Sequence, residues 1–191
     1  MNNKYIFLRH GESVANQRDI ICSSLKNGTS PEFGLTQLGI IQANYTSKVL
    51  KKELKKEDII IFTSPYTRAV QTALIVKSTL GIDNNNFFVS MNLKERGFES
   101  KELKSSKEYA KVWENDKKGK DSRGIEPCLS VALRIEEFYL MLNAKYNNKT
   151  IILVSHGDTI MIARTLLLGV SFFSHRDYDF IKNAECLVFT S

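Results

Sequence analysis

The sequence predicts an α/β fold: a three-layer α/β/α sandwich whose mostly parallel central sheet is flanked by helices on both faces. Short apolar runs of β-prone residues alternate with longer segments whose apolar residues recur at helical spacing, as parallel sheets with crossover helices require. Two of the runs, 5–8 and 151–154, carry no charge, and each is followed one residue later by a His-Gly step. Uninterrupted apolar runs of this length are typical of strands buried on both faces.

Strands are expected at 5–8, 58–62, 87–91, 150–154 and 184–189. Helices are expected at 36–49, 65–80, 109–113, 130–146 and 158–168. Thr36 is a residue type that caps helix N-termini, Ser64 and Pro65 stand in the favoured order for a cap and a first helical residue, and Gly81 fits a helix stop. The helix at 130–146 is expected to turn one apolar face inward, made of Val131, Ile135, Phe138 and Leu142. Residues 12–35 are polar and broken by glycine and proline, which predicts an irregular loop near the mouth of a pocket.

The length of 191 residues and the lack of any repeat or linker predict one domain, 1–191, with a lid-like excursion at about 97–127. The excursion is rich in lysine and glutamate and holds the only tryptophan, Trp113. Its basic part, 101–123, either selects a second anionic group on a substrate or forms a solvated surface. A second lysine cluster, 48–56, has helical spacing with interspersed glutamate and is predicted to be a solvated helix face.

Composition restricts the setting in which the chain works. Cys22, Cys128 and Cys186 are widely spaced and odd in number, which matches no disulfide framework or zinc pattern and predicts free thiols in the cytoplasm. No apolar segment is long enough for a signal peptide or a membrane span, so no membrane partner is expected. The net charge is +6, but no basic stripe interleaved with aromatic residues accompanies it, so no nucleic-acid partner is expected. The oligomeric state stays open.

Five reactive side chains are expected just beyond the ends of strands, and parallel strands bring such ends to one edge of a sheet. They are Arg9, His10, Arg68, Glu95 and His156. Two guanidinium groups match the oxygens of a phosphoryl group, and a neutral imidazole beside them can attack phosphorus. A second imidazole, if protonated, can stabilise charge in the transition state, and a carboxylic acid can protonate the departing alkoxide. This chemistry requires no metal and no other cofactor.

Four ordered motifs carry a resemblance to a known family. They are LRHGES at 8–13, SPYTRAVQTA at 64–73, LKERGF at 93–98 and VSHGD at 154–158. Together with GLTQLGIIQA at 34–43 and RGIEPCLSVALRIEEF at 123–138, they resemble the histidine phosphatase superfamily in its phosphoglycerate-mutase-like branch. The resemblance implies a phosphoglycerate-mutase-like fold and phosphoryl transfer through a phosphohistidine.

The resemblance also implies roles for the matching residues. His10 would be the nucleophile, Glu95 the general acid and base, and His156 a catalytic residue that also binds phosphate. The other phosphate-binding residues would be Arg9, Asn16, Arg68 and Gly157. The family often continues after its acid as Gly-x-x-Glu-Gly, which this chain lacks, so Glu99 remains an alternative proton donor. Asp158 is a weaker one, because Gly157 separates it from the second histidine.

The leading functional hypothesis is a cofactor-independent phosphatase that acts on a small phosphorylated substrate or a phosphoprotein. A mutase is the alternative, and the lack of the Arg-Arg-Ser and triple-proline stretch of phosphoglycerate mutases favours the phosphatase. Two other hypotheses are a catalytically idle phospho-ligand binding module and a metal hydrolase with His10, His156 and Asp158 as ligands, for which no HExxH spacing is present. The third histidine, His175, is expected to be a surface or structural residue of a late loop.

Overall fold

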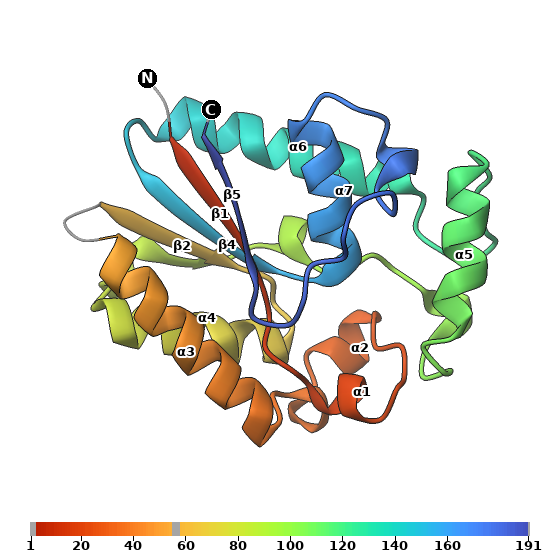
Figure 1. Ribbon diagram of the computed structural model, residues 1–191, viewed down its shortest axis with the longest axis horizontal. Helices are drawn as coiled ribbons and strands as arrows, with labels where there is room; N and C mark the ends of the chain where they lie inside the picture. Colours follow the sequence, from red (N-terminus) through yellow and green to blue (C-terminus); the bar gives the residue numbers. More distant parts are fainter. Residues whose placement is uncertain (1–2, 55–57, 191) are drawn as a thin grey trace.

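The computed structural model describes residues 3–54 and 58–190. A five-stranded sheet lies between two layers of helices, which confirms the predicted α/β/α sandwich (Figure 1). The strand order is β3-β2-β4-β1-β5, with β5 antiparallel to β1 and the other strand pairs parallel. The strands are β1 (Lys4–Arg9), β2 (Ile59–Thr63), β3 (Phe87–Val89), β4 (Thr150–Ser155) and β5 (Cys186–Thr190).

The two faces of the sheet hold separate apolar cores, because successive side chains of a strand point to opposite faces. In β1, Tyr5 and Phe7 pack in the core under α6 (Cys128–Lys145) and α7 (Gly157–Leu167). Ile6 and Leu8 pack in the other core, under α3 (Gln37–Glu53) and α4 (Thr67–Leu80). Burial on both faces is the reason why these strands are continuously apolar in sequence. The inward face predicted for α6 is confirmed, since Val131, Ile135, Phe138 and Leu142 are buried.

Helix ends follow the sequence signals in two places and depart from them in one. The Thr36 side chain accepts a hydrogen bond from the Gly39 backbone and caps α3, and Gly81 ends α4 in the left-handed conformation with φ of 71°. The predicted start of α4 at Pro65 is wrong, because Tyr66 is the N-cap residue and makes no side-chain cap. Ser64 instead directs its hydroxyl group to His156.

The prediction of an irregular loop at 12–35 is also wrong in part. This segment contains the one-turn helices α1 (Val14–Gln17) and α2 (Leu25–Gly28) and the 3-10 helix η1 (Pro31–Phe33). Each begins after a serine whose side chain accepts a backbone N–H: Ser13, Ser24 and Ser30. One-turn helices of this kind depend on such caps and have no apolar periodicity to predict them.

The excursion at 97–127 contains η4 (Glu99–Lys101) and α5 (Glu108–Lys117), which includes the predicted helix at 109–113. Helix α5 stands beyond the carboxyl ends of the strands, to the side of the sheet (Figure 1). The remaining 3-10 helices are η2 (Asn84–Asn86), η3 (Met91–Leu93) and η5 (Phe172–Ser174). No helix in the described ranges is both long and apolar enough to cross a membrane. Of the predicted basic helix face, Lys55 and Lys56 lie outside the described residues.

Candidate active site

A cavity of about 210 Å³ opens at the carboxyl edge of the parallel strands. Its lining includes most of the residues that the sequence predicted for the site: Arg9, His10, Asn16, Arg68, Glu95 and Gly157. Asp158 lines it as well, whereas the side chain of Glu99 is exposed and does not belong to the lining. The segments that converge here follow the ends of β1, β2 and β4, which are far apart in the sequence.

The His10 ring is held in one tautomer by two neighbours. Its Nδ1 lies 2.6 Å from the Gly11 carbonyl oxygen, which can only accept, and its Nε2 accepts a hydrogen bond of 3.1 Å from Arg68 Nε. Nδ1 therefore carries the hydrogen, and the lone pair is on Nε2. Burial, and then the charges of Arg68 and Arg9, hold the pKa of His10 well below its usual value. The imidazole is thus neutral and nucleophilic at neutral pH.

The two guanidinium groups beside His10 are fixed by contacts that sequence reasoning did not identify. Arg68 donates to the Cys22 carbonyl oxygen at 2.9 Å and approaches the Cys22 thiol at 3.6 Å. Arg9 donates to the Ile181 carbonyl oxygen at 2.8 Å and lies 5.0 Å from the centre of the Phe180 ring. The Phe180 ring also packs so closely against Gly157 that a Cβ atom at position 157 would lie only 2.5 Å from it. Both arginines are therefore positioned before any ligand binds.

His156 lies directly behind His10, with 5.1 Å between ring centroids. Its Nε2 is 2.7 Å from the Ser64 hydroxyl group, and its buried Nδ1 has no partner among the described residues. Burial, Arg68 and His10 keep the pKa of His156 well below its usual value. The protonated form considered from the sequence is therefore disfavoured in the free site, because the ring is fully buried near three arginines and a second imidazole.

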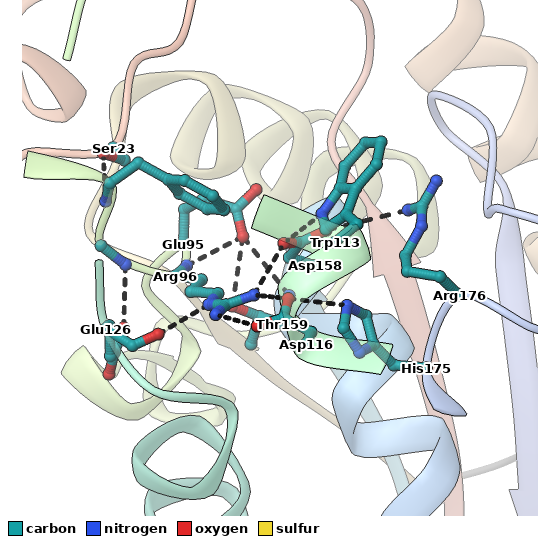
Figure 2. Close-up of polar contacts among 12 residues, drawn as sticks. Ser23, Glu95, Arg96, Trp113, Asp116, Glu126, Asp158, Thr159, His175 and Arg176 are labelled. Atoms are coloured by element: carbon teal, nitrogen blue, oxygen red, sulfur yellow. Dashed lines mark hydrogen bonds and ion pairs between the residues drawn. The ribbon is translucent and has the colours of Figure 1, made fainter. Parts of the chain in front are cut away.

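Glu95 lines the same cavity with 8% of its surface exposed. Its Oε1 accepts hydrogen bonds from the Arg96 backbone at 2.9 Å and from the backbone and hydroxyl of Thr159, both at 3.3 Å (Figure 2). Burial and then the Asp158 carboxylate raise the pKa of Glu95, although Arg68 and Arg9 oppose this. The environment thus favours the protonated carboxylic acid, which can donate a proton.

Asp158 has three partners of its own (Figure 2). Trp113 Nε1 donates to both carboxylate oxygens at 3.1 and 3.0 Å, and Arg96 and Arg176 lie at 3.6 and 3.8 Å. Trp113 lines the cavity and belongs to α5, so part of the 97–127 excursion forms one wall of the site. The role of the whole excursion as a lid stays a prediction.

The proposed metal-ligand set of His10, His156 and Asp158 does not form a ligand cluster in the described part of the chain. The ligand-type cluster found there is Asp116, Cys128 and His175, whose donor atoms lie within 4.8 Å of one another. Both oxygens of Asp116 are bonded to the Arg96 guanidinium, at 2.6 and 2.9 Å. That guanidinium already neutralises the carboxylate, so an ion pair accounts for this cluster. His175 is fully buried and structural rather than at the surface.

The chain is similar to known proteins in both sequence and structure. The putative phosphoserine phosphatase 2 of Hydrogenobacter thermophilus is 29% identical over 178 residues, 85% of this chain and 77% of that protein. Phosphoglycerate mutase 3 of Saccharomyces cerevisiae is 28% identical over 93 residues, which span 47% of this chain and only 29% of the mutase. A solved structure of phosphoserine phosphatase from Entamoeba histolytica, in complex with 3-phosphoglyceric acid, superposes with a TM-score of 0.78 at 26% identity, covering 98% of this chain and 90% of that one.

The sheet order, the helical layers and the solved relatives define the phosphoglycerate-mutase-like class of α/β proteins. Within that class, the model of the histidine phosphatase superfamily (branch 1) matches residues 5–190. The chain belongs to the histidine phosphatase superfamily.

Proposed function

We propose that the protein is a cofactor-independent phosphatase that hydrolyses small phosphomonoesters through a phosphohistidine on His10. The observation that carries the proposal is the position of the buried His10 ring, which lines the cavity and has its Nε2 3.1 Å from Arg68 Nε. Burial and the two arginines lower the pKa of His10, which favours its neutral form. A nucleophile of this kind needs a neutral nitrogen and nearby positive charge for the oxygens that it approaches.

Substrate binding would use the groups around His10. The guanidinium groups of Arg9 and Arg68 would bind the phosphoryl oxygens as charge-assisted donors. The Asn16 carbonyl oxygen is occupied by Ser13 and Asn183, which leaves its amide group to donate to phosphate. Gly157 begins α7, so its backbone N–H points from a helix N-terminus, where anions bind. A bound dianion would also favour protonation of His156, which then adds positive charge in the transition state.

The reaction would proceed in two steps. His10 Nε2 attacks phosphorus while the bond to the alkoxide breaks, and Glu95 gives its proton to that oxygen. The Glu95 carboxylate then takes a proton from a water molecule, which attacks the phosphohistidine and releases inorganic phosphate and neutral His10. No step draws on a metal ion, because Arg9, Arg68 and His156 supply the positive charge.

The size of the cavity favours a small metabolite as the substrate rather than a phosphoprotein. Pockets for drug-sized ligands have volumes of roughly 300–1,000 Å³, and this one has about 210 Å³. The names of the relatives point to three-carbon phosphorylated acids, namely phosphoserine and 3-phosphoglyceric acid. A mutase remains the second candidate, on the match to phosphoglycerate mutase 3 over 47% of this chain.

The proposal is tested with purified protein and a panel of phosphomonoesters that includes phosphoserine, 3-phosphoglycerate and an aryl phosphate. We expect inorganic phosphate to be released, vanadate to inhibit and EDTA to leave the rate unchanged. Transfer of the phosphoryl group between the hydroxyls of phosphoglycerate, without release of phosphate, would support the mutase instead. Loss of activity in EDTA would refute the metal-independent mechanism.

The pH dependence of Glu95→Gln tests the proton donor. The first step needs protonated Glu95. Its rate is therefore full at pH values below the pKa of Glu95 and falls as the pH rises through that pKa. Because burial and Asp158 raise this pKa, the alkaline limb of kcat/KM should lie above the range of an ordinary glutamate. The variant should lose that limb, and kcat/KM should fall about 10²- to 10⁴-fold for alkyl phosphates, more than for aryl phosphates, whose leaving groups need less protonation. Glu99→Gln is the matched control and should behave as wild type; a larger effect of Glu99→Gln would assign the acid to Glu99.

A further inference from the structure

Tyr109 brings a hydroxyl group to the cavity from outside the family motifs. The residue lies in the first turn of α5 and lines the cavity together with Arg9, Arg68 and Glu95. No described residue accepts a hydrogen bond from its hydroxyl group. A polar group that faces a cavity without a protein partner is available to a ligand.

The Tyr109 ring is fixed by aromatic contacts on two sides. It stacks on Trp113 with 5.1 Å between ring centroids and 4° between ring planes. It also packs edge to face against Phe98, with 4.8 Å between centroids and 88° between planes. Trp113 is itself held by its hydrogen bonds to Asp158 and by the Arg176 guanidinium 3.6 Å above its ring (Figure 2). The hydroxyl group is therefore preorganised before a ligand enters.

The charges around the hydroxyl group define what it can bind. Burial, and then the Glu95 and Asp158 carboxyl groups, raise the pKa of Tyr109, so that the phenol stays protonated at neutral pH and can donate. Arg68 and Arg9 lower the pKa of Tyr109, so the phenol lies within the electrostatic influence of both guanidinium groups. A protonated hydroxyl donor that lines a cavity together with two cations suits an anionic oxygen of a ligand.

We infer that Tyr109 is a further catalytic residue, whose hydroxyl group donates a hydrogen bond to a non-bridging oxygen of the bound phosphoryl group. The inference rests on the proposed function and adds to it a donor supplied by the 97–127 excursion. A hydrogen bond to a phosphoryl oxygen is charge-assisted and strengthens as negative charge gathers on that oxygen in the transition state. Helix α5 would thus contribute to chemistry directly, in addition to forming a wall.

Tyr109→Phe tests the inference, because it removes the hydroxyl group and keeps the ring contacts with Trp113 and Phe98. We expect kcat/KM to fall about 10- to 100-fold, equally for aryl and alkyl phosphates, since loss of a hydrogen bond to a charged group has an effect of this order. The stabilisation of the protein by vanadate, measured as a shift in Tm, should weaken in parallel. Tyr45→Phe is the matched control, because Tyr45 is 72% exposed on α3 and its hydroxyl group lies outside the cavity lining.

The outcomes separate this inference from the proposed function. A wild-type protein that binds vanadate but hydrolyses nothing would refute the proposed function, and the Tm shifts of the two variants would still decide the role of Tyr109. Equal activity and equal vanadate stabilisation in Tyr109→Phe and Tyr45→Phe would overturn the inference. A loss confined to one leaving group would also overturn it, since the hydroxyl group would then contact the alcohol part of the substrate.

Discussion

His10→Ala is expected to lower kcat for phosphomonoester hydrolysis by a factor on the order of 10⁴ or more, since removal of an enzyme's nucleophile has effects of this size. The physical reason is that, among the described residues that line the cavity, His10 is the one that offers an imidazole nitrogen. His156 is fully buried and does not belong to the cavity lining, and Glu95 is favoured in its protonated form. The variant would keep Arg9 and Arg68, so binding of phosphate should persist while turnover is lost.

Two measurements check this prediction. Reactions with a radiolabelled substrate, quenched in alkaline detergent because phosphohistidine is stable in base and labile in acid, should show label on the wild-type protein and none on His10→Ala. Inorganic phosphate should still raise the Tm of the variant, which would show that the anion site has folded. Full activity of His10→Ala, or label retained on it, would contradict the phosphohistidine mechanism.

The sequence predicted those parts of the molecule that depend on local patterns. Apolar runs located the strands, and the His-Gly steps placed His10 and His156 at one edge of the sheet, because the ends of parallel strands meet there. Thr36 and Gly81 were assigned correctly because caps act within one turn of a helix. These features need only residue type and spacing.

The features that sequence reasoning missed depend on contacts between distant segments. Ser64 was expected to cap a helix because Ser-Pro commonly does so, but the fold brings His156 to its hydroxyl group, 92 positions away in sequence. The contact between Arg68 and Cys22 joins a helix to a segment predicted as a loop. Asp116 lies on a helix whose exposed side is rich in lysine, and no periodic pattern indicates that its carboxylate is buried. Such pairs require tertiary structure.

Asp116→Ala is expected to lower the free energy of unfolding by about 3–5 kcal/mol, as when one partner of a buried ion pair is removed. Arg96 is fully buried, and its guanidinium holds Asp116 through two hydrogen bonds of 2.6 and 2.9 Å. Its Nε also donates to the Glu126 carbonyl oxygen at 2.7 Å. Although burial opposes it, the hydrogen bonds to Asp116 raise the pKa of Arg96. A guanidinium stays protonated in proteins even without such a partner, so Asp116→Ala would leave a positive charge in the core without its two strongest hydrogen bonds. Urea unfolding of the variant and the wild type measures the loss.

The double variant Arg96→Met/Asp116→Leu distinguishes an orphaned charge from simple loss of packing. It removes both charges and keeps apolar volume, so it should be less destabilised than Asp116→Ala alone; equal destabilisation would contradict this explanation.

The single variant Asp116→Ala should also change catalysis, because Arg96 is 3.6 Å from Asp158 and would turn toward it once Asp116 is gone. Closer positive charge would offset the effect of Asp158 and lower the pKa of Glu95. Because the acid form is then lost at lower pH, the alkaline limb of kcat/KM should move to lower pH in Asp116→Ala. The buried ion pair would thus link the stability of α5 to the protonation of the proposed acid.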